Sequence, residues 1–304
     1  MEGRSSLALL AGAVAAAVAA AAAFFLRAPP PPSFSRAKVV LFGDSITQHS
    51  FEPGGWGATI ADFFSRRCDV FNRGFGGYNT RWARHVLPKL FPEGEDAPHF
   101  LVTCWFGAND AAAESEKPHV PLAEYEDNLR HIVQHLKRVS SHVVVLTPPP
   151  VHGPTRLAFQ KLKYGARASG VLERTTERAG QYAATAARVA AEQGVPCLDV
   201  HKLMLAEGES NWPALVGEGS KSGDGLHLVE AGQKFVGKAL VALLIDALGL
   251  PRRLSPEEAT PQERILVEVP RLPIELPPGA RLSPDGYAAQ IEEHEKRATG
   301  RTVL

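Results

Sequence analysis

Five short apolar segments are separated by longer stretches of helical periodicity, and this order constrains the fold more than any other feature. The segments are rich in Val, Leu and Phe, and polar and apolar residues do not alternate cleanly within them, which is typical of strands covered on both faces. They span Lys38–Phe42, Cys68–Asn72, His99–Phe106, His142–Thr147 and Val195–Val200. Helices are predicted at Trp56–Arg67, Thr80–Leu90, Leu122–Val139, Leu172–Gln193 and Glu230–Leu248. The pattern predicts an α/β fold of three layers (α/β/α) around a doubly wound, five-stranded parallel sheet with right-handed crossovers.

Composition changes at both ends of this region. Leu7–Leu26 has no charged residue, Arg4 and Arg27 flank it, and a run of prolines at 29–32 follows. After Leu250, prolines recur in a pattern that predicts an extended tail. We therefore expect a leader and spacer at residues 1–36, a folded domain at residues 37–250, and a Pro-rich tail at residues 251–304.

The apolar leader leaves the location of the domain open. The length of Leu7–Leu26 suits a signal anchor, which would make the protein membrane-associated. A cleaved signal peptide fits as well and would place the domain in a lumen or outside the cell. A leader that never enters a membrane is the third alternative. Basic residues are more frequent after the segment than before it, which favours a cytoplasmic domain.

Charge and potential ligand residues exclude several classes of function. Lys plus Arg and Asp plus Glu are both 33, so no basic excess favours nucleic-acid binding. Cys68, Cys104 and Cys197 lie in or beside predicted strands without metal-ligand spacing, so we expect buried free thiols. His131 and His135 are spaced like a metal pair on a helix, but no Glu follows His131 and no third ligand is evident. We expect both on a solvated face, and we expect no metal or other cofactor.

Four short motifs lie at strand ends or in loops. Gly43-Asp44-Ser45-Ile46 directly follows the first predicted strand, at the edge where parallel α/β sheets bind their ligands. The others are the glycine-rich Asn72–Thr80, then Gly107–Asp110 and Asp224–His227. The glycine-rich segment lacks the third Gly of a dinucleotide fingerprint and the Gly-Lys-Ser/Thr of a phosphate loop. Singly, the motifs are also explained by a turn, a helix cap or a surface hydrogen-bonded pair.

Together, the motifs supply the groups that acyl transfer by a serine requires. Ser45 is the candidate nucleophile, His227 the candidate general base, and Asp224 the carboxylate that orients the imidazole. Candidate oxyanion donors are the backbone N–H groups of Ser45 and Gly77 and the side-chain amide of Asn109. Because strands of a parallel sheet end on one edge, these groups are expected to converge.

Several neighbours of these residues are candidates for bracing or binding. Asp44 is expected to brace its turn by accepting backbone N–H groups. His49 is close to Ser45 in sequence, but Asp224 makes His227 the better candidate base. Four aromatic residues flank the proposed donors and could line an acyl or alcohol pocket, with ordinary core packing as the alternative. They are Phe75, Tyr78, Trp105 and Phe106.

The motifs resemble the four blocks of the SGNH/GDSL hydrolase family, which carry a Ser, a Gly, an Asn and a His. The matching positions are Gly43-Asp44-Ser45, Gly77, Gly107-x-Asn109-Asp110 and Asp224-x-x-His227. The strings at residues 42–48, 54–57 and 72–82 further resemble the isoamyl-acetate-hydrolysing esterase group. The resemblance covers residues 38–248 and implies a flavodoxin-like sheet and metal-independent hydrolysis of small esters by a serine esterase.

Three departures from that group leave the substrate open. The leader and the tail are additional, and Val151–Gly170, where the family often varies over the active-site mouth, is basic here. A lysophospholipid, a thioester or an acetylated sugar is therefore an alternative substrate. A non-catalytic binding module tethered to a membrane is the alternative from another class, and the complete set of motif residues argues against it. No Gly-x-Ser-x-Gly elbow is present, which disfavours the α/β-hydrolase fold.

Overall fold

A computed structural model describes residues 36–94, 99–217 and 223–250 of the chain. The predicted leader Leu7–Leu26 and the predicted tail at residues 251–304 lie outside the described residues. Within those ranges, no helix combines the length and apolar character that crossing a bilayer requires.

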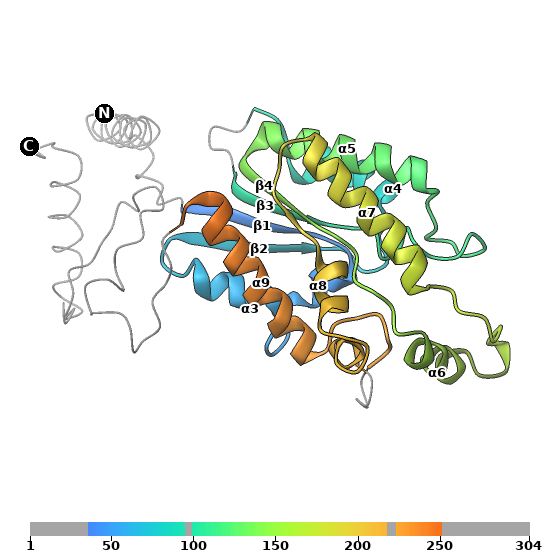
Figure 1. The fold of residues 1–304 in the computed structure, drawn as a ribbon. Helices are drawn as coiled ribbons and strands as arrows, with labels where there is room; N and C mark the ends of the chain where they lie inside the picture. Colours follow the sequence, from blue (N-terminus) through green and yellow to red (C-terminus); the bar gives the residue numbers. More distant parts are fainter. Residues whose placement is uncertain (1–35, 95–98, 218–222, 251–304) are drawn as a thin grey trace, which may run out of the picture. The chain divides into compact units, whose positions relative to one another are not determined.

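Five parallel strands form one sheet in the order β2-β1-β3-β4-β5, which confirms the predicted doubly wound architecture (Figure 1). The strands are β1 (Ala37–Gly43), β2 (Cys68–Gly74), β3 (His99–Trp105), β4 (Ser140–Leu146) and β5 (Cys197–Leu198). This is the flavodoxin-like order, in which the connection from β1 runs to β2 on one side and the connection from β3 runs to β4 on the other. Ligands of such sheets bind beyond the carboxyl ends of the strands at this switch point.

Helices cover both faces of the sheet (Figure 1). One face packs against α3 (Trp56–Phe63), α8 (Val200–Ala206) and α9 (Glu230–Leu248). The other face packs against α4 (Thr80–Leu90), α5 (Leu122–Val139) and α7 (Thr176–Glu192). Two further helices, α2 (Ser45–Gln48) and α6 (Gly153–Tyr164), follow the carboxyl ends of β1 and β4. The described residues also form three short 3-10 turns: η1 (His49–Phe51), η2 (Gly165–Arg167) and η3 (Trp212–Val216).

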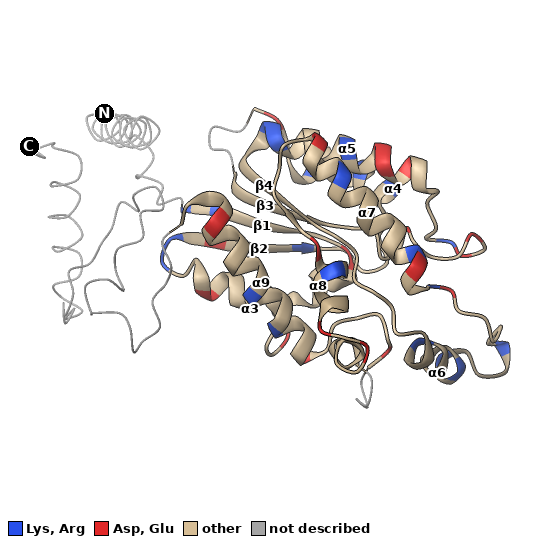
Figure 2. Cartoon of the chain, in the orientation of Figure 1, with Lys and Arg blue, Asp and Glu red and all other residues tan. Residues whose placement is uncertain are grey.

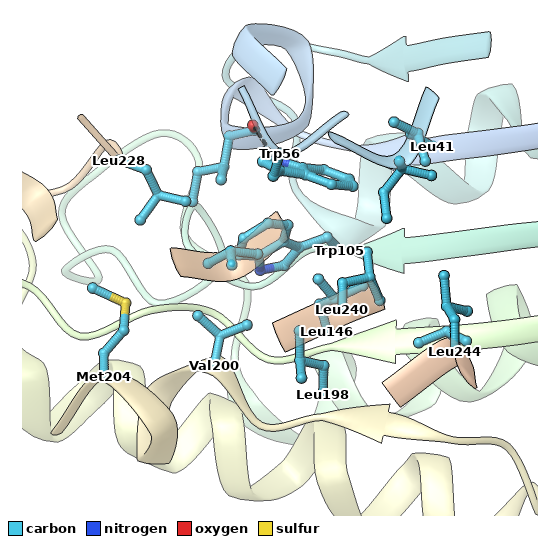
Figure 3. Close-up of a cluster of buried hydrophobic side chains, with 14 of the residues drawn as sticks. Leu41, Trp56, Trp105, Leu146, Leu198, Val200, Met204, Leu228, Leu240 and Leu244 are labelled. Atoms are coloured by element: carbon cyan, nitrogen blue, oxygen red, sulfur yellow. Dashed lines mark hydrogen bonds between the residues drawn. The ribbon is translucent and has the colours of Figure 1, made fainter. Parts of the chain in front are cut away.

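Alternate residues of each central strand enter two separate hydrophobic cores. Leu41 of β1 joins Trp56 and Leu240 in the core under α3 and α9 (Figure 3). Phe42, the next residue, joins the core under α4, α5 and α7. Both faces of the strands are therefore buried, which explains why these segments read as continuous apolar runs. The indole of Trp105 packs 5.3 Å from that of Trp56 and donates Nε1–H to the Thr147 carbonyl, so its polar atom is also satisfied.

The boundaries of the last helix before β5 differ from the prediction for a physical reason. The helix was expected from Leu172, but α7 begins at Thr176. Glu173 and Arg174 are instead held in a buried polar cluster, and the Thr175 side chain caps the helix by accepting the Arg178 N–H at 3.2 Å. Helices α6 and α8 were not predicted, and the predicted strand Val195–Val200 pairs only at Cys197–Leu198.

The expected surroundings of the cysteines and the histidine pair are partly confirmed. The three thiols are free, with Cys68 and Cys104 buried and Cys197 half-buried. His131 is exposed, as predicted. The solvated face is wrong for His135, which is buried and donates Nε2–H to the Phe91 carbonyl oxygen at 2.7 Å. This hydrogen bond gives the buried ring a polar partner, which the spacing of residues along the helix could not reveal.

Candidate active site

Ser45 lies at the start of α2, directly after the central strand β1. The carboxylate of Asp44 caps this helix by accepting the Ile46 N–H at 2.9 Å, which confirms its predicted bracing role. Gly43 has no room for a side chain, because a Cβ there would lie 2.6 Å from the carbonyl oxygen of Trp105 in the neighbouring strand. The Gly-Asp-Ser sequence thus lets the chain turn tightly off the sheet and leaves Ser45 half-buried at its edge.

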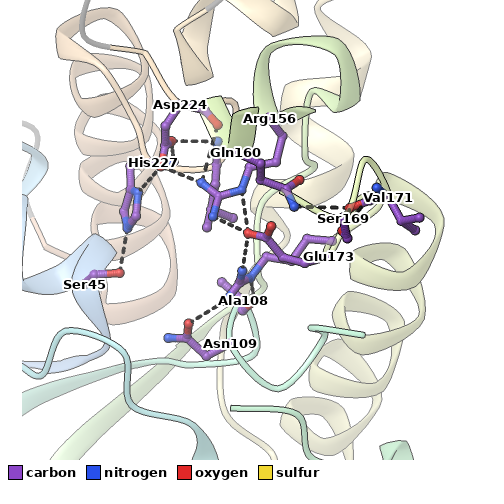
Figure 4. A network of polar contacts seen from close by, with 12 residues as sticks. Ser45, Ala108, Asn109, Arg156, Gln160, Ser169, Val171, Glu173, Asp224 and His227 are labelled. Carbon is purple, nitrogen blue, oxygen red and sulfur yellow. Dashed lines mark hydrogen bonds and ion pairs between the residues drawn. The ribbon is translucent and has the colours of Figure 1, made fainter. Parts of the chain in front are cut away.

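The hydroxyl of Ser45, the imidazole of His227 and the carboxylate of Asp224 form a continuous hydrogen-bonded chain (Figure 4). Ser45 Oγ lies 2.8 Å from His227 Nε2, and His227 Nδ1 lies 2.8 Å from Asp224 Oδ2. A carboxylate only accepts hydrogen bonds, so Nδ1 carries the proton and the Nε2 of a neutral ring accepts from the serine. The structure therefore brings together the three residues that the sequence proposed for nucleophilic catalysis.

The carboxylate of Asp224 is shielded and held in its charged form. Burial alone would raise the pKa of Asp224, but hydrogen bonds and charge from His227, with the N–H groups of His227 and Leu226, lower the pKa below its usual value. Those two N–H groups donate to Oδ1 at 2.8 Å and 2.9 Å. The side chain of Asp224 is 9% exposed and that of His227 38%. A small molecule can therefore reach the imidazole while the carboxylate behind it stays out of solvent.

Two of the proposed oxyanion donors, Gly77 and Asn109, follow β2 and β3, the neighbours of β1, and the third, Ser45, follows β1 itself. The Asn109 amide is fixed at both ends: Oδ1 accepts from Arg174 Nη2 at 3.1 Å, and Nδ2 donates to the Tyr78 carbonyl at 2.9 Å. One hydrogen of Nδ2 remains for another acceptor. Gly77 is exposed, and among the described residues no acceptor contacts its N–H. Ser45 is the first residue of α2, so no carbonyl of a preceding helical turn accepts its N–H.

The four aromatic residues considered for substrate binding divide into two pairs. Trp105 and Phe106 are buried in the two opposite cores, Phe106 with its ring centroid 4.9 Å from that of Phe42. Both side chains therefore pack in the protein interior, which is the alternative that the sequence left open for them. Phe75 and Tyr78 are half-buried on either side of Gly77, with ring centroids 5.1 Å apart. These two rings remain candidates for substrate contact.

The second histidine near the serine has another partner. His49 Nδ1 lies 2.6 Å from Glu52 Oε1, and its ring lies edge-on to the ring of His227 with centroids 5.9 Å apart. Ser45 contacts His227 rather than His49, in agreement with the sequence-based preference. In the part of the chain that the structure describes, no group of three or more His, Cys, Asp or Glu residues is placed to hold a metal ion.

Two buried carboxyl groups lie behind the site. Burial raises the pKa of Asp44 to about 6 and that of Asp110 to about 7, against hydrogen bonds that lower both. Asp110 Oδ1 accepts the N–H and the hydroxyl of Thr80, while its Oδ2 has no hydrogen-bond partner. These groups brace the loops after β1 and β3, and their protonation is coupled to stability.

Sequence reasoning missed three charged residues that contact the site: Arg156, Glu173 and Arg174. Arg156 Nη1 donates to Asp224 Oδ2 at 2.7 Å, and Arg174 donates to Asn109. Arg156 was seen only as part of the basic stretch, and the other two were placed within a helix. The adjacent threonines at 175–176 are an N-cap signal that would have placed Glu173 and Arg174 in a loop.

Comparison with known proteins shows the family to which the chain is similar. The GDSL-like Lipase/Acylhydrolase family matches residues 41–235. A GDSL esterase/lipase of Arabidopsis thaliana is 42% identical over 228 residues, covering 73% of this chain and 89% of the relative. The Mus musculus protein named isoamyl acetate-hydrolyzing esterase 1 homolog is 40% identical over 242 residues, covering 75% and 92%. A lipase/acylhydrolase structure from Enterococcus faecalis, 24% identical, shares the fold with a TM-score of 0.52 over 73% of this chain and 100% of its own.

Proposed function

The chain belongs to the GDSL-like lipase/acylhydrolase family and is a carboxylic ester hydrolase, and from this premise we propose that it cleaves small acetate-type esters with a Ser-His-Asp triad. The observation that carries the proposal is the hydrogen-bonded chain from Ser45 Oγ through His227 to Asp224. The name of the mouse relative, which specifies isoamyl acetate, supports an acetate-type substrate.

In the proposed reaction, Ser45 Oγ attacks the acyl carbonyl while His227 Nε2 takes the serine proton. Asp224 stabilises the imidazolium that forms. The oxygen of the tetrahedral intermediate accepts from the N–H groups of Ser45 and Gly77 and from Asn109 Nδ2. His227 then protonates the leaving alcohol, and a water molecule activated by His227 cleaves the acyl-enzyme to release the acid and restore Ser45.

The rings of Phe75 and Tyr78 are proposed to contact the acyl or alcohol group. They flank Gly77 and retain partial exposure, so they offer apolar surface next to the oxyanion donor. Replacing Phe75 with Ala is expected to raise KM for a small ester more than it lowers kcat, because the ring contacts no reacting atom.

Hydrolysis of a panel of para-nitrophenyl esters tests the proposal. The full-length protein is expected to give its highest kcat/KM with acetate and lower values with butyrate and octanoate. Ser45→Ala is expected to abolish hydrolysis of every ester while its thermal unfolding stays close to that of the wild type. Hydrolysis that survives in Ser45→Ala would remove the serine from the mechanism, and a preference for octanoate would overturn the acetate assignment.

A second candidate substrate, the ester of an anionic lysophospholipid, is favoured by the α6 tip, defined as residues 161–171. Leu162 and Val171 are 85% and 69% exposed, and the tip also exposes Lys161, Lys163 and Arg167. Residues 153–172 contain no Asp or Glu, and Figure 2 shows the basic residues of α6 without acidic ones among them. Exposed apolar and basic side chains together complement an anionic lipid surface.

Lipid binding separates the two candidates. If the substrate is a lysophospholipid, we expect the protein to sediment with phosphatidylserine vesicles and the double variant Leu162→Asp, Lys163→Glu to stay in the supernatant. We also expect a higher kcat/KM with lysophosphatidylserine than with para-nitrophenyl acetate. Equal sedimentation of both proteins, or a lower kcat/KM with the lipid, rejects this candidate.

We also propose that Leu7–Leu26 attaches the protein to a membrane, which fractionation of cells expressing the full chain and a chain without residues 1–36 would test.

A further inference from the structure

A buried series of charged side chains joins the proposed triad to the proposed oxyanion hole (Figure 4). Asp224 lies at one end, and Arg156, Glu173 and Arg174 connect it to Asn109 at the other. The four charged side chains are between 7% and 10% exposed. Two are positive and two negative, so the series is neutral as a unit. An ion buried this deeply is tolerated only with its partners in place.

Arg156 divides its guanidinium between two carboxylates. Nη1 donates to Asp224 Oδ2 at 2.7 Å, the same oxygen that accepts the Nδ1–H of His227. Nε donates to Glu173 Oε1 at 2.8 Å, and Nη2 donates to the same oxygen. The planar fork of an arginine can bridge two acids in this way, whereas a lysine ammonium cannot. Arg156 therefore fixes the oxygen that orients the imidazole and offsets part of its negative charge.

Arg156 is itself held close to the loop that carries Asp224. Gly225 in that loop has a φ of +75°, and a Cβ there would lie 2.6 Å from the backbone nitrogen of Arg156. The carbonyl of Gly225 accepts the N–H of His152, the residue before α6, at 2.9 Å. The first turn of α6 and the Asp224 loop thus pack backbone against backbone, which limits the freedom of the guanidinium.

Arg174 orients the amide at the other end of the series. Its Nη1 donates to Glu173 Oε1 at 2.8 Å, Nε to the Ala108 carbonyl at 3.0 Å, and Nη2 to Asn109 Oδ1 at 3.1 Å. A guanidinium accepts no hydrogen bond, so the amide oxygen must face Arg174 and Nδ2 must face the opposite way. Without Arg174, only the hydrogen bond from Nδ2 to the Tyr78 carbonyl at 2.9 Å would still hold the amide in this orientation.

We propose that Arg156, Glu173 and Arg174 are positioning residues that hold the triad carboxylate and the oxyanion amide in one rigid arrangement. This inference rests on the proposed function. Arg156 acts through Asp224, Arg174 acts through Asn109, and Glu173 holds both guanidiniums. The two halves of the machinery, carried on loops after different strands, are thereby kept at a constant separation.

Double-mutant cycles test the proposal, because a residue that acts through another loses its effect when the other is absent. Arg174→Met is expected to lower kcat for para-nitrophenyl acetate about 10- to 100-fold with little change in KM, the range for one charge-assisted hydrogen bond. In an Asn109→Ala background, the same substitution is expected to lower kcat less than threefold. Equal losses in both backgrounds would overturn the role of Arg174.

Arg156 is tested through Asp224 in the same way. Arg156→Met is expected to lower kcat for para-nitrophenyl acetate about 10- to 100-fold with little change in KM, because Asp224 Oδ2 loses a charge-assisted hydrogen bond. In an Asp224→Asn background it is expected to cause no further loss. Equal losses in both backgrounds would overturn the role of Arg156. Arg188→Met is the control, since it removes the same charge from a surface pair with Glu126 at 2.6 Å and should leave kcat unchanged.

Charge-conserving variants cover the case in which a methionine variant fails to fold. Arg156→Lys and Arg174→Lys keep the buried charge but lose the fork, and both are expected to retain cooperative unfolding and to show the same non-additivity. Additive losses in both lysine variants would overturn the proposal. Failure of the inference is separable from failure of the proposed function: in the first case Ser45→Ala is still inactive and the arginine effects are additive, whereas in the second Ser45→Ala still hydrolyses the ester.

Discussion

Replacing Asp224 with Asn tests how the triad is oriented. The carboxylate accepts four hydrogen bonds: Oδ1 from the N–H groups of Leu226 and His227, and Oδ2 from His227 Nδ1 and Arg156 Nη1. The amide of an asparagine has only one oxygen, so it can accept from either the backbone pair or the side-chain pair of donors, but not from both. If the oxygen keeps the backbone pair, the new NH2 group faces Nδ1 and the imidazole must shift its proton to Nε2. Nε2–H then points at Ser45 and cannot accept its proton.

The expected loss follows from this tautomer. The equivalent substitution in a serine protease triad lowers kcat about 10⁴-fold, which corresponds to about 5 kcal/mol of transition-state stabilisation. We expect a similar loss of kcat here with KM nearly unchanged, measured on para-nitrophenyl acetate with burst titration of active sites. Asp199→Asn is the matched control, because Asp199 caps α8 through the Lys202 N–H at 3.1 Å and Asn caps equally well. Turnover of Asp224→Asn within tenfold of the wild type would show that Asp224 does not set the tautomer of His227.

Three further substitutions test the oxyanion amide, a buried acid and the turn before the serine. Asn109→Ala is expected to lower kcat about 10²- to 10³-fold, and a change confined to KM would make it a binding residue. Burial raises the pKa of Asp110 from 3.8 to about 7, so the native state holds a proton that the unfolded state releases, and stability falls as pH rises between these values. Asp110→Asn should remove that fall, on the order of 4 kcal/mol in urea unfolding between pH 4 and pH 7, and an unchanged slope would contradict it. Gly43→Ala should destabilise the protein by about 2 kcal/mol or more, because its Cβ would meet the Trp105 carbonyl at 2.6 Å, and a wild-type melting temperature would contradict this.

The order of the elements could be predicted because the signals for them are local. Residues such as Leu41 and Phe42 are both apolar since the strand is buried on both faces, and that pattern is visible without knowledge of any partner. Ser45, Asn109 and His227 could be grouped because loops at the carboxyl ends of parallel strands share one edge. The start of α7 could not be placed from the sequence. Glu173 and Arg174 are both acceptable in a helix, but their tertiary contacts hold them outside it.

Residues whose role depends on distant partners were beyond the sequence. Arg156 and Glu173 meet only because α6 returns to the Asp224 loop, and a basic stretch is ordinarily solvated. Trp105 and Phe106 stand next to the oxyanion motif in sequence, but their side chains point into the two opposite cores. The spacing of residues along the chain does not show whether a cation will be buried. It also does not show which face of the sheet an aromatic side chain at the end of a strand will point to.

Covalent capture of Ser45 by a fluorophosphonate, located by peptide mass spectrometry, tests whether Ser45 is the nucleophile. We expect one adduct per chain, on Ser45, which is absent in Ser45→Ala and forms much more slowly in Asp224→Asn. An adduct on a different residue, or labelling of the intact domain that persists in Ser45→Ala, would contradict the claim that Ser45 is the nucleophile.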